Sequence, residues 1–230
     1  MIDMHSHILP GIDDGARNID EALAMLEDVY NKGCDTVVAT PHLRVYSDEE
    51  LVNAVKMRDV AYDALMSAAE KRKASIPRIK KGFEVHLDKD ITAFSSFNGI
   101  CIEGTDKMLV EMPMHYWDTF ALSRIDSLRK NGIVPVIAHI DRYMGFKKNI
   151  ENALSLEGVI YQVNAEAFFT FSGRRLVRRL LKAGKNVVAG SDMHNLTTRK
   201  SRLYEANKKM TGKYKGYEAV FYGNASGLLQ

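Results

Sequence analysis

The chain has 230 residues, of which 46% are hydrophobic and 27% charged, as expected of a globular protein that can bury a sizeable core. Its net charge of +3 is too small to indicate nucleic-acid binding, and its two cysteines, Cys34 and Cys101, have no spacing that indicates a disulfide framework. No apolar run is long enough to span a membrane and no signal peptide is evident, so we expect a cytoplasmic protein.

Strand-like apolar runs recur along the whole chain. We expect seven strands, at residues 1–4, 35–40, 79–85, 107–112, 133–138, 159–164 and 186–190. In the first half of the chain, Asn18 caps a helix that ends at Gly33. Ser47 and Glu50 have the form of a capping box, which starts a long helix that reaches about residue 74.

Further helices are expected in the second half of the chain. They cover residues 119–131, residues 148–156, and a basic stretch that Ser172 caps and that ends near Gly184, with helices again in the remainder. Strands that alternate with helices over the whole length imply parallel βα units. Such units form either an open, doubly wound sheet or a closed barrel.

Metal-ligating side chains stand near the ends of these strands. The nine candidates are His5, His7, Asp14, His42, Glu84, Glu111, His139, Asp192 and His194. His5 and His7 are two residues apart on a strand, so their imidazoles point to the same side. Placement that recurs across almost the whole chain means that the strand ends converge on one polynuclear metal site.

A closed barrel explains this placement better than an open sheet does. In a barrel the ends of all strands face one central mouth, whereas the outer strands of an open sheet cannot reach the site. We therefore predict a distorted (β/α)7 barrel of the TIM type, a single domain over residues 1–230, with the metal site at the C-terminal ends of the strands. Seven units instead of eight would make the barrel irregular.

Five imidazoles and four carboxylates are too many ligands for one ion. Two or three divalent ions that share bridging carboxylates would use all of them, and the mixture of nitrogen and oxygen ligands favours Mn, Fe or Zn. Ion clusters of this kind generate a bound hydroxide and hold a phosphoryl group during in-line displacement. The ligand set therefore favours phosphoryl chemistry.

Some polar residues near these motifs keep a second interpretation. A lone histidine at a strand end is usually a hydrogen-bonded structural residue, and we expect this of His86 and His115. Asp13 and Asp14 are adjacent, and one of them is expected to cap the loop. Physical reasoning alone does not decide which of the two is the ligand.

Seven motifs around these residues carry a family resemblance. They are Asp3-Met-His5-Ser-His7, Thr40-Pro-His42, Gly82-Phe-Glu84, Leu109-Val-Glu111, Ala138-His139-Ile-Asp-Arg142, Gln162-Val-Asn164 and Ser191-Asp192-Met-His194. Through them the chain resembles the PHP (polymerase and histidinol phosphatase) superfamily, from residue 2 to about residue 206. Within it, the chain is most similar to the manganese-dependent protein-tyrosine phosphatases of the CpsB/YwqE type, which belong to bacterial capsule and exopolysaccharide gene clusters.

The resemblance implies a distorted barrel that carries three metal ions on the nine candidate ligands, with Asp14 in preference to Asp13. It also implies that Arg142 and Arg199 bind the substrate phosphate and support the transition state. The substrate that it implies is a phosphotyrosyl protein, an autophosphorylating bacterial tyrosine kinase of capsular or exopolysaccharide synthesis. Because such a kinase acts at the inner membrane, the phosphatase would work at the cytoplasmic face without inserting into the bilayer.

Two segments depart from the family pattern. Ile140 and Asp141 stand where members commonly have Pro-Glu, and residues 165–169 (AEAFF) replace a segment that is usually small and glycine-containing. These departures leave the ligand set intact and affect substrate preference and loop shape. Among the aromatic residues near the motifs, Tyr46 and Tyr143 are the better candidates to flank a phosphotyrosyl ring.

Two other functions compete with the phosphotyrosine phosphatase. The first is another PHP phosphoesterase, such as a histidinol-phosphate phosphatase that acts on a small molecule. The second is a non-catalytic binding module that uses the basic residues between positions 174 and 185. The complete ligand set argues against a role in binding alone.

Overall fold

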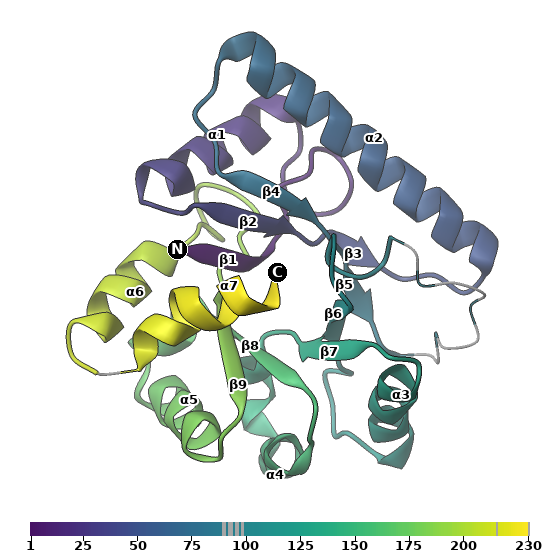
Figure 1. Cartoon of the computed structure of the whole chain (residues 1–230), viewed down its shortest axis with the longest axis vertical. Helices are drawn as coiled ribbons and strands as arrows, with labels where there is room; N and C mark the ends of the chain where they lie inside the picture. Colours follow the sequence, from purple (N-terminus) through teal and green to yellow (C-terminus); the bar gives the residue numbers. More distant parts are fainter. Residues whose placement is uncertain (89–90, 92–93, 95–96, 98, 215, 230) are drawn as a thin grey trace.

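Nine strand segments form the inner wall of the molecule and helices cover its outside, in a computed structural model that describes residues 1–88, 91, 94, 97, 99–214 and 216–229 (Figure 1). The segments are β1 (Ile2–Ser6), β2 (Thr36–Ala39), β3 (His42–Leu43), β4 (Arg78–Lys81), β5 (Glu84–His86), β6 (Lys107–Glu111), β7 (Val134–Ile137), β8 (Ile160–Asn164) and β9 (Asn186–Gly190).

The nine segments make seven strands, because two strands are interrupted. β2 continues into β3 after Pro41, which has no N–H for the sheet, and β4 continues into β5 after Gly82. The two interrupted strands remain hydrogen-bonded across the break, since Gly82 N donates to Ala39 O (2.9 Å) and Glu84 N donates to Pro41 O (3.0 Å). The expected number of seven strands is therefore confirmed.

All neighbouring strands run parallel, in the order of the chain, from β1 round to β9. The last strand then meets the first. Asp192 N donates to His5 O (2.8 Å) and His7 N donates to Met193 O (2.9 Å), just beyond the end of β9. The sheet is thus closed into the irregular seven-stranded barrel that the sequence predicts, and the open sheet is excluded.

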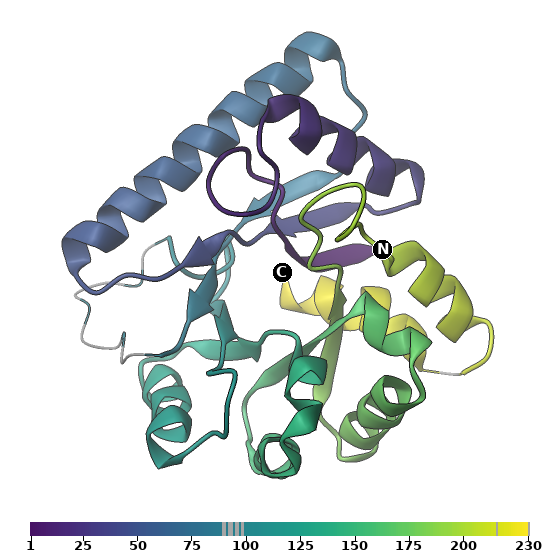
Figure 2. The ribbon, with the colours of Figure 1, turned by 180° about the vertical axis from the view of Figure 1, so that it is seen from behind.

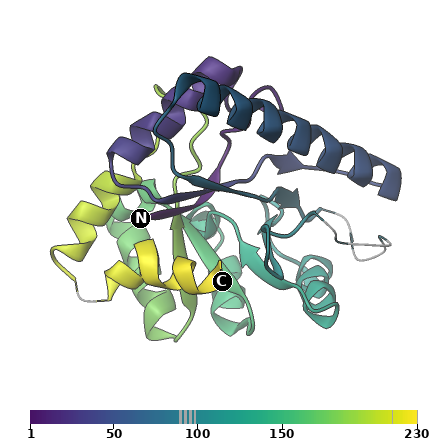
Figure 3. The same cartoon turned by 45° about the horizontal axis from the view of Figure 1, so that its top comes forward.

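In the described part of the chain, seven α-helices and three short segments of 3₁₀ or π-helical turns cover the barrel. The helices are α1 (Ile19–Asn31), α2 (Asp48–Arg72), α3 (Thr119–Lys130), α4 (Lys147–Ser155), α5 (Phe171–Lys182), α6 (Leu203–Thr211) and α7 (Asn224–Leu228), and the turns are η1 (Ile140–Gly145), η2 (Ala165–Phe169) and η3 (Ala219–Gly223). Helices α1 and α2 pack side by side over β2 and β4 (Figure 3). Figure 2 views the opposite side, where the loops after β1 and β9 lie in front.

The interior of the barrel has an apolar layer closed at one end by α7. Leu109, Val136 and Val188 pack there, together with Ala225 of α7. Lys80 Nζ donates to Leu229 O (2.9 Å), which ties the end of α7 to the barrel wall. Figure 1 shows α7 lying across this end. The mouth at the other end, where the strands finish, is left for polar side chains.

Two of the three predicted helix caps are confirmed and one is wrong. The side chains of Asn18 and Ser47 accept hydrogen bonds from Glu21 N and Glu50 N, as expected. The prediction that Ser172 caps the basic helix is wrong. Thr170 is the cap, because its Oγ1 accepts a hydrogen bond from Gly173 N (3.0 Å) and its backbone is extended.

Candidate metal centre

The strand ends bring eight of the nine candidate ligands into three groups, and the ligand atoms within each group lie within 4.8 Å of one another. We name the groups the Asp14 cluster, the His5 cluster and the His139 cluster. Their members are His7, Asp14, His42 and His194; His5, His7 and Glu84; and Glu84, Glu111 and His139. Since His7 and Glu84 each belong to two clusters, the three form one continuous site.

Glu84 joins the clusters through its two carboxylate oxygens. Its Oε2 lies 3.2 Å from His5 Nε2, 3.3 Å from His7 Nε2 and 3.0 Å from His42 Nδ1. Its Oε1 lies 2.7 Å from His139 Nε2. The carboxylate is almost completely buried, because Glu84 projects from β5 into the mouth of the barrel. A carboxylate placed in this way suits a bridge between two cations.

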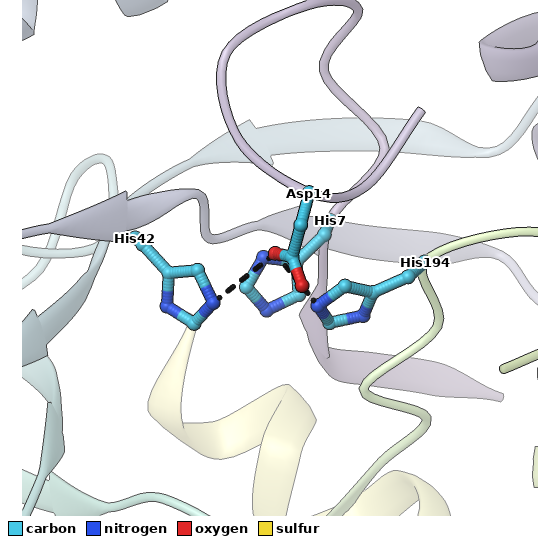
Figure 4. Close-up of side chains that lie close together, drawn as sticks. All are labelled: His7, Asp14, His42 and His194. Carbon is cyan, nitrogen blue, oxygen red and sulfur yellow. Dashed lines mark ion pairs between the residues drawn. The ribbon is translucent and has the colours of Figure 1, made fainter. Parts of the chain in front are cut away.

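The Asp14 cluster lies nearest to solvent. The loop after β1 places the Asp14 carboxylate between the rings of His42 and His194, and His7 lies behind them (Figure 4). Asp14 Oδ1 is 3.4 Å from His42 Nε2 and 3.2 Å from His194 Nε2. Asp14 is 62% exposed at its side chain, so ligands or substrate can approach this cluster from outside.

Asp192, the ninth candidate, lies beside the clusters and pairs with both candidate phosphate-binding arginines. Its Oδ1 is 3.6 Å from His7 Nε2 and accepts a hydrogen bond from Arg199 Nη2 (2.9 Å). Its Oδ2 accepts a hydrogen bond from Arg142 Nη2. Arg199 also lies near Asp14, at 3.4 Å. Arg142 and Arg199 thus converge from two loops on one edge of the candidate site.

A cavity of about 280 Å³ opens at this edge. It is lined by both arginines and by Asp141, Asn164, Glu166, Ser191, Asp192, Thr198 and Lys200. The loop that presents Arg199 is held in place by Asn195, whose Oδ1 accepts backbone hydrogen bonds from Thr197, Thr198 and Arg199. Two guanidinium groups, one lysine and three carboxylates therefore meet at a cavity next to the candidate metal ligands.

Asp13 is the residue that holds the loop, which answers the question that the sequence leaves open about this pair. Its Oδ1 accepts a hydrogen bond from Gly15 N (3.0 Å), and its Oδ2 lies 2.6 Å from His7 Nδ1. The same Oδ2 accepts a hydrogen bond from His42 N (3.0 Å). Asp13 therefore orients two candidate ligands, while the neighbouring Asp14 reaches into the cluster.

Two residues of β8 support the site without having been assigned a role from the sequence. Gln162 Oε1 lies 3.1 Å from His5 Nδ1 and accepts a hydrogen bond from His139 N (2.6 Å). Asn164 Nδ2 donates to Asp192 Oδ2 (3.0 Å). Gln162 and Asn164 are two residues apart on a strand, the spacing that singled out His5 and His7, and this signal could have found them.

Other residues near the site fall into two groups. His86 Nε2 lies 2.8 Å from Glu111 Oε2, so it is a hydrogen-bonded neighbour of a candidate ligand, as expected. The interpretation of Tyr143 as a residue flanking the substrate ring is wrong. Tyr143 is fully buried, and its hydroxyl donates to Met112 O (2.8 Å) in the core. Tyr46 is 49% exposed, and its contact with the substrate ring stays a prediction.

The electrostatics of the site favour anionic carboxylates. Burial by itself would raise the pKa of Glu84, but the charge of His5 and hydrogen bonds from neighbouring imidazoles outweigh burial and hold the pKa well below its usual value. For Glu111 the balance of the same effects lowers the pKa to about 2. Burial opposes the charged form of His5, yet Glu84 and Asp192 raise its pKa to about 9. The site therefore attracts positive charge.

The donor set fits divalent cations better than it fits a network of hydrogen bonds. The Nε2 atoms of His5 and His7 face one another at 3.1 Å, where at most one of them can carry a proton toward the other. His194 Nε2 is buried and makes no hydrogen bond, although Asp14 Oδ1 lies 3.2 Å away. Nitrogen and carboxylate ligands at these spacings are those that Mn, Fe and Zn accept.

Backbone strain coincides with the site. Among the described residues other than glycine, a positive φ occurs at Lys73, which caps α2, and at His139 (31°) and Asp192 (51°). Left-handed conformations cost energy for these residue types and persist where the surrounding structure imposes them. His139 closely follows the end of β7 and Asp192 closely follows the end of β9, and both side chains contact other residues of the candidate site.

Comparisons with known proteins agree along the whole chain. The family model for capsular polysaccharide synthesis proteins CpsB/CapC matches residues 1–230. The tyrosine-protein phosphatase CpsB of Streptococcus agalactiae serotype V is 29% identical over 100% of this chain and 98% of its own length. The tyrosine-protein phosphatase YwqE of Bacillus subtilis is 28% identical over 90% of this chain and 82% of its own length.

Two solved structures are also similar to this chain. A structure from the work on YwqE of Bacillus subtilis and CpsB of Streptococcus pneumoniae, described as unique metal-dependent tyrosine phosphatases, superposes with a TM-score of 0.82 at 25% identity, covering 100% of this chain and 94% of that one. The phosphotriesterase homology protein of Escherichia coli superposes with a TM-score of 0.50 at 11% identity, covering 100% and 98%. This second likeness shows a shared barrel fold alone.

Proposed function

The chain belongs to the CpsB/CapC family of capsular polysaccharide synthesis, and we propose that it is a metal-dependent protein-tyrosine phosphatase. The observation that carries the proposal is the continuous set of imidazoles and carboxylates beside the pocket of Arg142 and Arg199. We propose further that residues 1–230 form one phosphatase domain, since the family model covers all of them and the candidate ligands extend from His5 to His194.

The metal ligands that we propose are His5, His7, Asp14, His42, Glu84, Glu111, His139, Asp192 and His194. Three clusters joined by His7 and Glu84 support two or three ions, for which Mn is our first choice and Fe and Zn are alternatives. When bound, such ions would activate a water molecule as the nucleophile and neutralise charge on the phosphoryl oxygens.

The protein side chains would bind and orient the phosphomonoester. Arg142 and Arg199 offer planar forks that match phosphate oxygens, and a bound phosphate would take over the contacts that both arginines now make with Asp192. Asn164 Nδ2 would continue to hold the Asp192 carboxylate. The phenolate leaving group of phosphotyrosine has a pKa near 10, so it can depart with little protonation.

A phosphotyrosyl protein is the substrate that we propose, on the strength of the relatives named tyrosine-protein phosphatase. The finer proposal is an autophosphorylating bacterial tyrosine kinase that regulates capsular or exopolysaccharide synthesis, met at the cytoplasmic face of the membrane. Within the described residues, each helix is too short or too polar to cross a lipid bilayer.

The test is hydrolysis of a phosphotyrosyl peptide by metal-stripped protein, with and without added Mn²⁺. We expect phosphate release by the wild type only when the metal is restored, and none by a His5→Ala/His7→Ala variant under either condition. Full activity of the wild type after verified removal of the metal would refute the mechanism.

The alternative functions predict different results in the same assay. Faster hydrolysis of histidinol phosphate than of the phosphotyrosyl peptide would favour a phosphatase of small molecules. Absence of hydrolysis in a folded, metal-loaded protein would favour a binding module that uses its basic residues.

A further inference from the structure

A cavity with a cationic lining lies outside the candidate metal centre, between α4 and α5. This cleft of about 330 Å³ has an apolar floor made by Met144, Ile150 and Leu176. Figures 1 and 2 show the two helices side by side on the outside of the barrel. The cleft is therefore a concave feature of the surface that the proposed hydrolysis does not use.

The rim of the cleft is positively charged. Lys147, Arg175 and Arg179 line it, and its lining includes no carboxylate. Lys147 has a distant, exposed partner in Glu151, at 3.8 Å, which contributes little. In the described part of the chain, no ion pair engages Arg175 or Arg179. Three cationic side chains thus face one cleft with almost no internal compensation.

The other arginines of α5 have structural partners, which separates them from the cleft. Arg174 Nη1 donates to Phe168 O (3.0 Å), and Arg178 lies over the ring of Tyr214 at 5.8 Å. The four arginines of α5 therefore fall into two pairs with different surroundings. One pair of arginines fastens the helix to its surroundings, and the other pair lines the cleft.

An apolar floor below guanidinium groups fits a ligand that is aromatic at one end and anionic at the other. Methyl and methylene groups of the floor would contact the faces of a ring, while planar arginine forks would bind phosphate oxygens. Two exposed aromatic residues, Phe146 (40%) and Phe171 (75%), stand at the starts of α4 and α5 but are not among the residues that line the cleft. A flat anionic surface would not fill such a concavity, so the shape favours a single side chain.

The cleft and the pocket of Arg142 and Arg199 are lined by neighbouring segments of the chain. Met144 of the floor belongs to η1, two residues after Arg142, and η1 leads directly into Lys147 of α4. On the other side, η2 carries Glu166 of the first pocket and ends just before Ser172, which lines the cleft. Residues that line the two cavities are therefore separated by only two residues of chain through η1 and by six through η2.

We propose that the cleft between α4 and α5 binds a second phosphotyrosyl side chain of the same substrate polypeptide. The inference rests on the proposed function, since it takes a phosphotyrosyl protein as the substrate. It adds that doubly phosphorylated segments bind more tightly than singly phosphorylated ones, because a second contact within one molecule raises the effective concentration of the first.

The experiment measures binding of two non-hydrolysable peptides to the metal-loaded protein by fluorescence anisotropy. One peptide carries two phosphonate analogues of phosphotyrosine several residues apart, and the other carries one. We expect the wild type to bind the first peptide more tightly, by roughly ten-fold. The variant Arg175→Ala/Arg179→Ala should lose this preference and keep its affinity for the second peptide.

The matched control is Lys148→Ala/Lys182→Ala, which removes two charges from the same helices outside the lining of the cleft. It should keep the preference for the doubly modified peptide, and thermal melts should show that both variants are folded. Equal affinities of the wild type for the two peptides would overturn the proposal, as would equal losses in the two variants.

Two further outcomes would change the role assigned to the cleft or to the metal centre. Binding to phosphatidylserine vesicles that depends on Arg175 and Arg179, without a preference for the doubly modified peptide, would replace the proposal with a membrane-facing role. Wild-type protein that binds the peptides as expected but hydrolyses no phosphotyrosyl peptide with Mn²⁺ would refute the proposed function and leave the cleft as a binding site.

Discussion

Asp13 acts on the metal centre through the residues beside it. One carboxylate lies against the ring of His7, accepts the backbone N–H of His42, and holds the backbone of the loop that carries Asp14. Its pKa is lowered to about 2, because the contacts with His7 and the backbone outweigh the effect of burial, so it is anionic at neutral pH. A carboxylate on the ring nitrogen that does not bind the metal fixes the orientation of an imidazole ligand and raises its basicity.

Replacing Asp13 by Ala should therefore weaken metal binding although no proposed ligand is removed. We expect a loss of about 10- to 100-fold in metal affinity, with a smaller loss for Asp13→Asn, which keeps one acceptor. Titration of metal-stripped protein with Mn²⁺, followed by calorimetry, measures this. Asp63→Asn, on the exposed face of α2, is the matched control, and an Asp13→Ala protein with wild-type affinity would contradict the prediction.

The thiols of Cys34 and Cys101 should react only slowly with alkylating reagents near neutral pH. Burial raises the pKa of Cys34 to about 12 and that of Cys101 to about 11, and the thiolate is the reactive species. The thiolate fraction falls as pH drops below the pKa, so at pH 8 Cys101 should be alkylated about 100-fold more slowly than a thiol with pKa 9.

Iodoacetamide at pH 8 is the reagent for this measurement, with mass spectrometry and the phosphatase assay as readouts. Activity should survive, and both thiols should react after unfolding in urea. Rapid alkylation of Cys101 accompanied by loss of activity would show that the thiol is more exposed and more acidic than its surroundings in the structure allow.

At the scale of helices and strands, local signals locate an element more reliably than they fix its ends. The expected strand at residues 79–85 is broken after Lys81, where Gly82 and Phe83 turn the chain before β5. Thr170 and Ser172 are both hydroxyl residues at the start of α5, and either one can cap a helix in a local pattern. The end of η2 decides between them, because it leaves Thr170 with an extended backbone.

These two hydroxyls give a direct test of the cap. Thr170→Ala should destabilise the protein by about 0.5–2 kcal/mol, because Gly173 N loses its acceptor at the first turn of α5. Ser172→Ala should change stability by less than about 0.5 kcal/mol, since Ser172 is exposed. Urea denaturation of the metal-loaded proteins compares the two, and equal effects would argue against the assignment of Thr170.

At the scale of the whole molecule, the barrel could be predicted because the signals for it are spread over the whole sequence. Seven apolar runs with polar residues at their ends are sufficient to count the strands and to place the mouth. The positions of Asp192 and Gln162 relative to their partners could not be predicted, since Gln162 bridges His5 and His139 from a strand far away in the chain. Single contacts of this kind depend on side-chain packing, which the strand pattern does not contain.

Removal of the metal should destabilise the entire barrel, since the proposed ligands come from almost every strand. An ion present at 100 times its Kd stabilises a protein by about 2.7 kcal/mol per site. For a chain of this size, that corresponds to a decrease in Tm of roughly 5–10 °C for each site that chelation empties. Calorimetry with and without EDTA measures the shift.

The His5→Ala/His7→Ala variant provides the comparison for this experiment. It should melt at a temperature that depends much less on EDTA, because two clusters have lost ligands. A wild-type Tm that does not respond to chelation would mean that the folded state gains nothing from the ions.

The closure of the barrel has a consequence for the time at which activity can arise. Ser191 N donates to Asp3 Oδ1 across 188 residues of sequence, so β1 lacks this partner until the residues after β9 have been synthesised. Contacts of such long range are slow to form, because a large loop must close first. A partly synthesised chain, or a fragment cut before β9, would hold an incomplete set of ligands. Hydrolysis would therefore begin only after β9 and the segment that carries Asp192 and His194 have been synthesised.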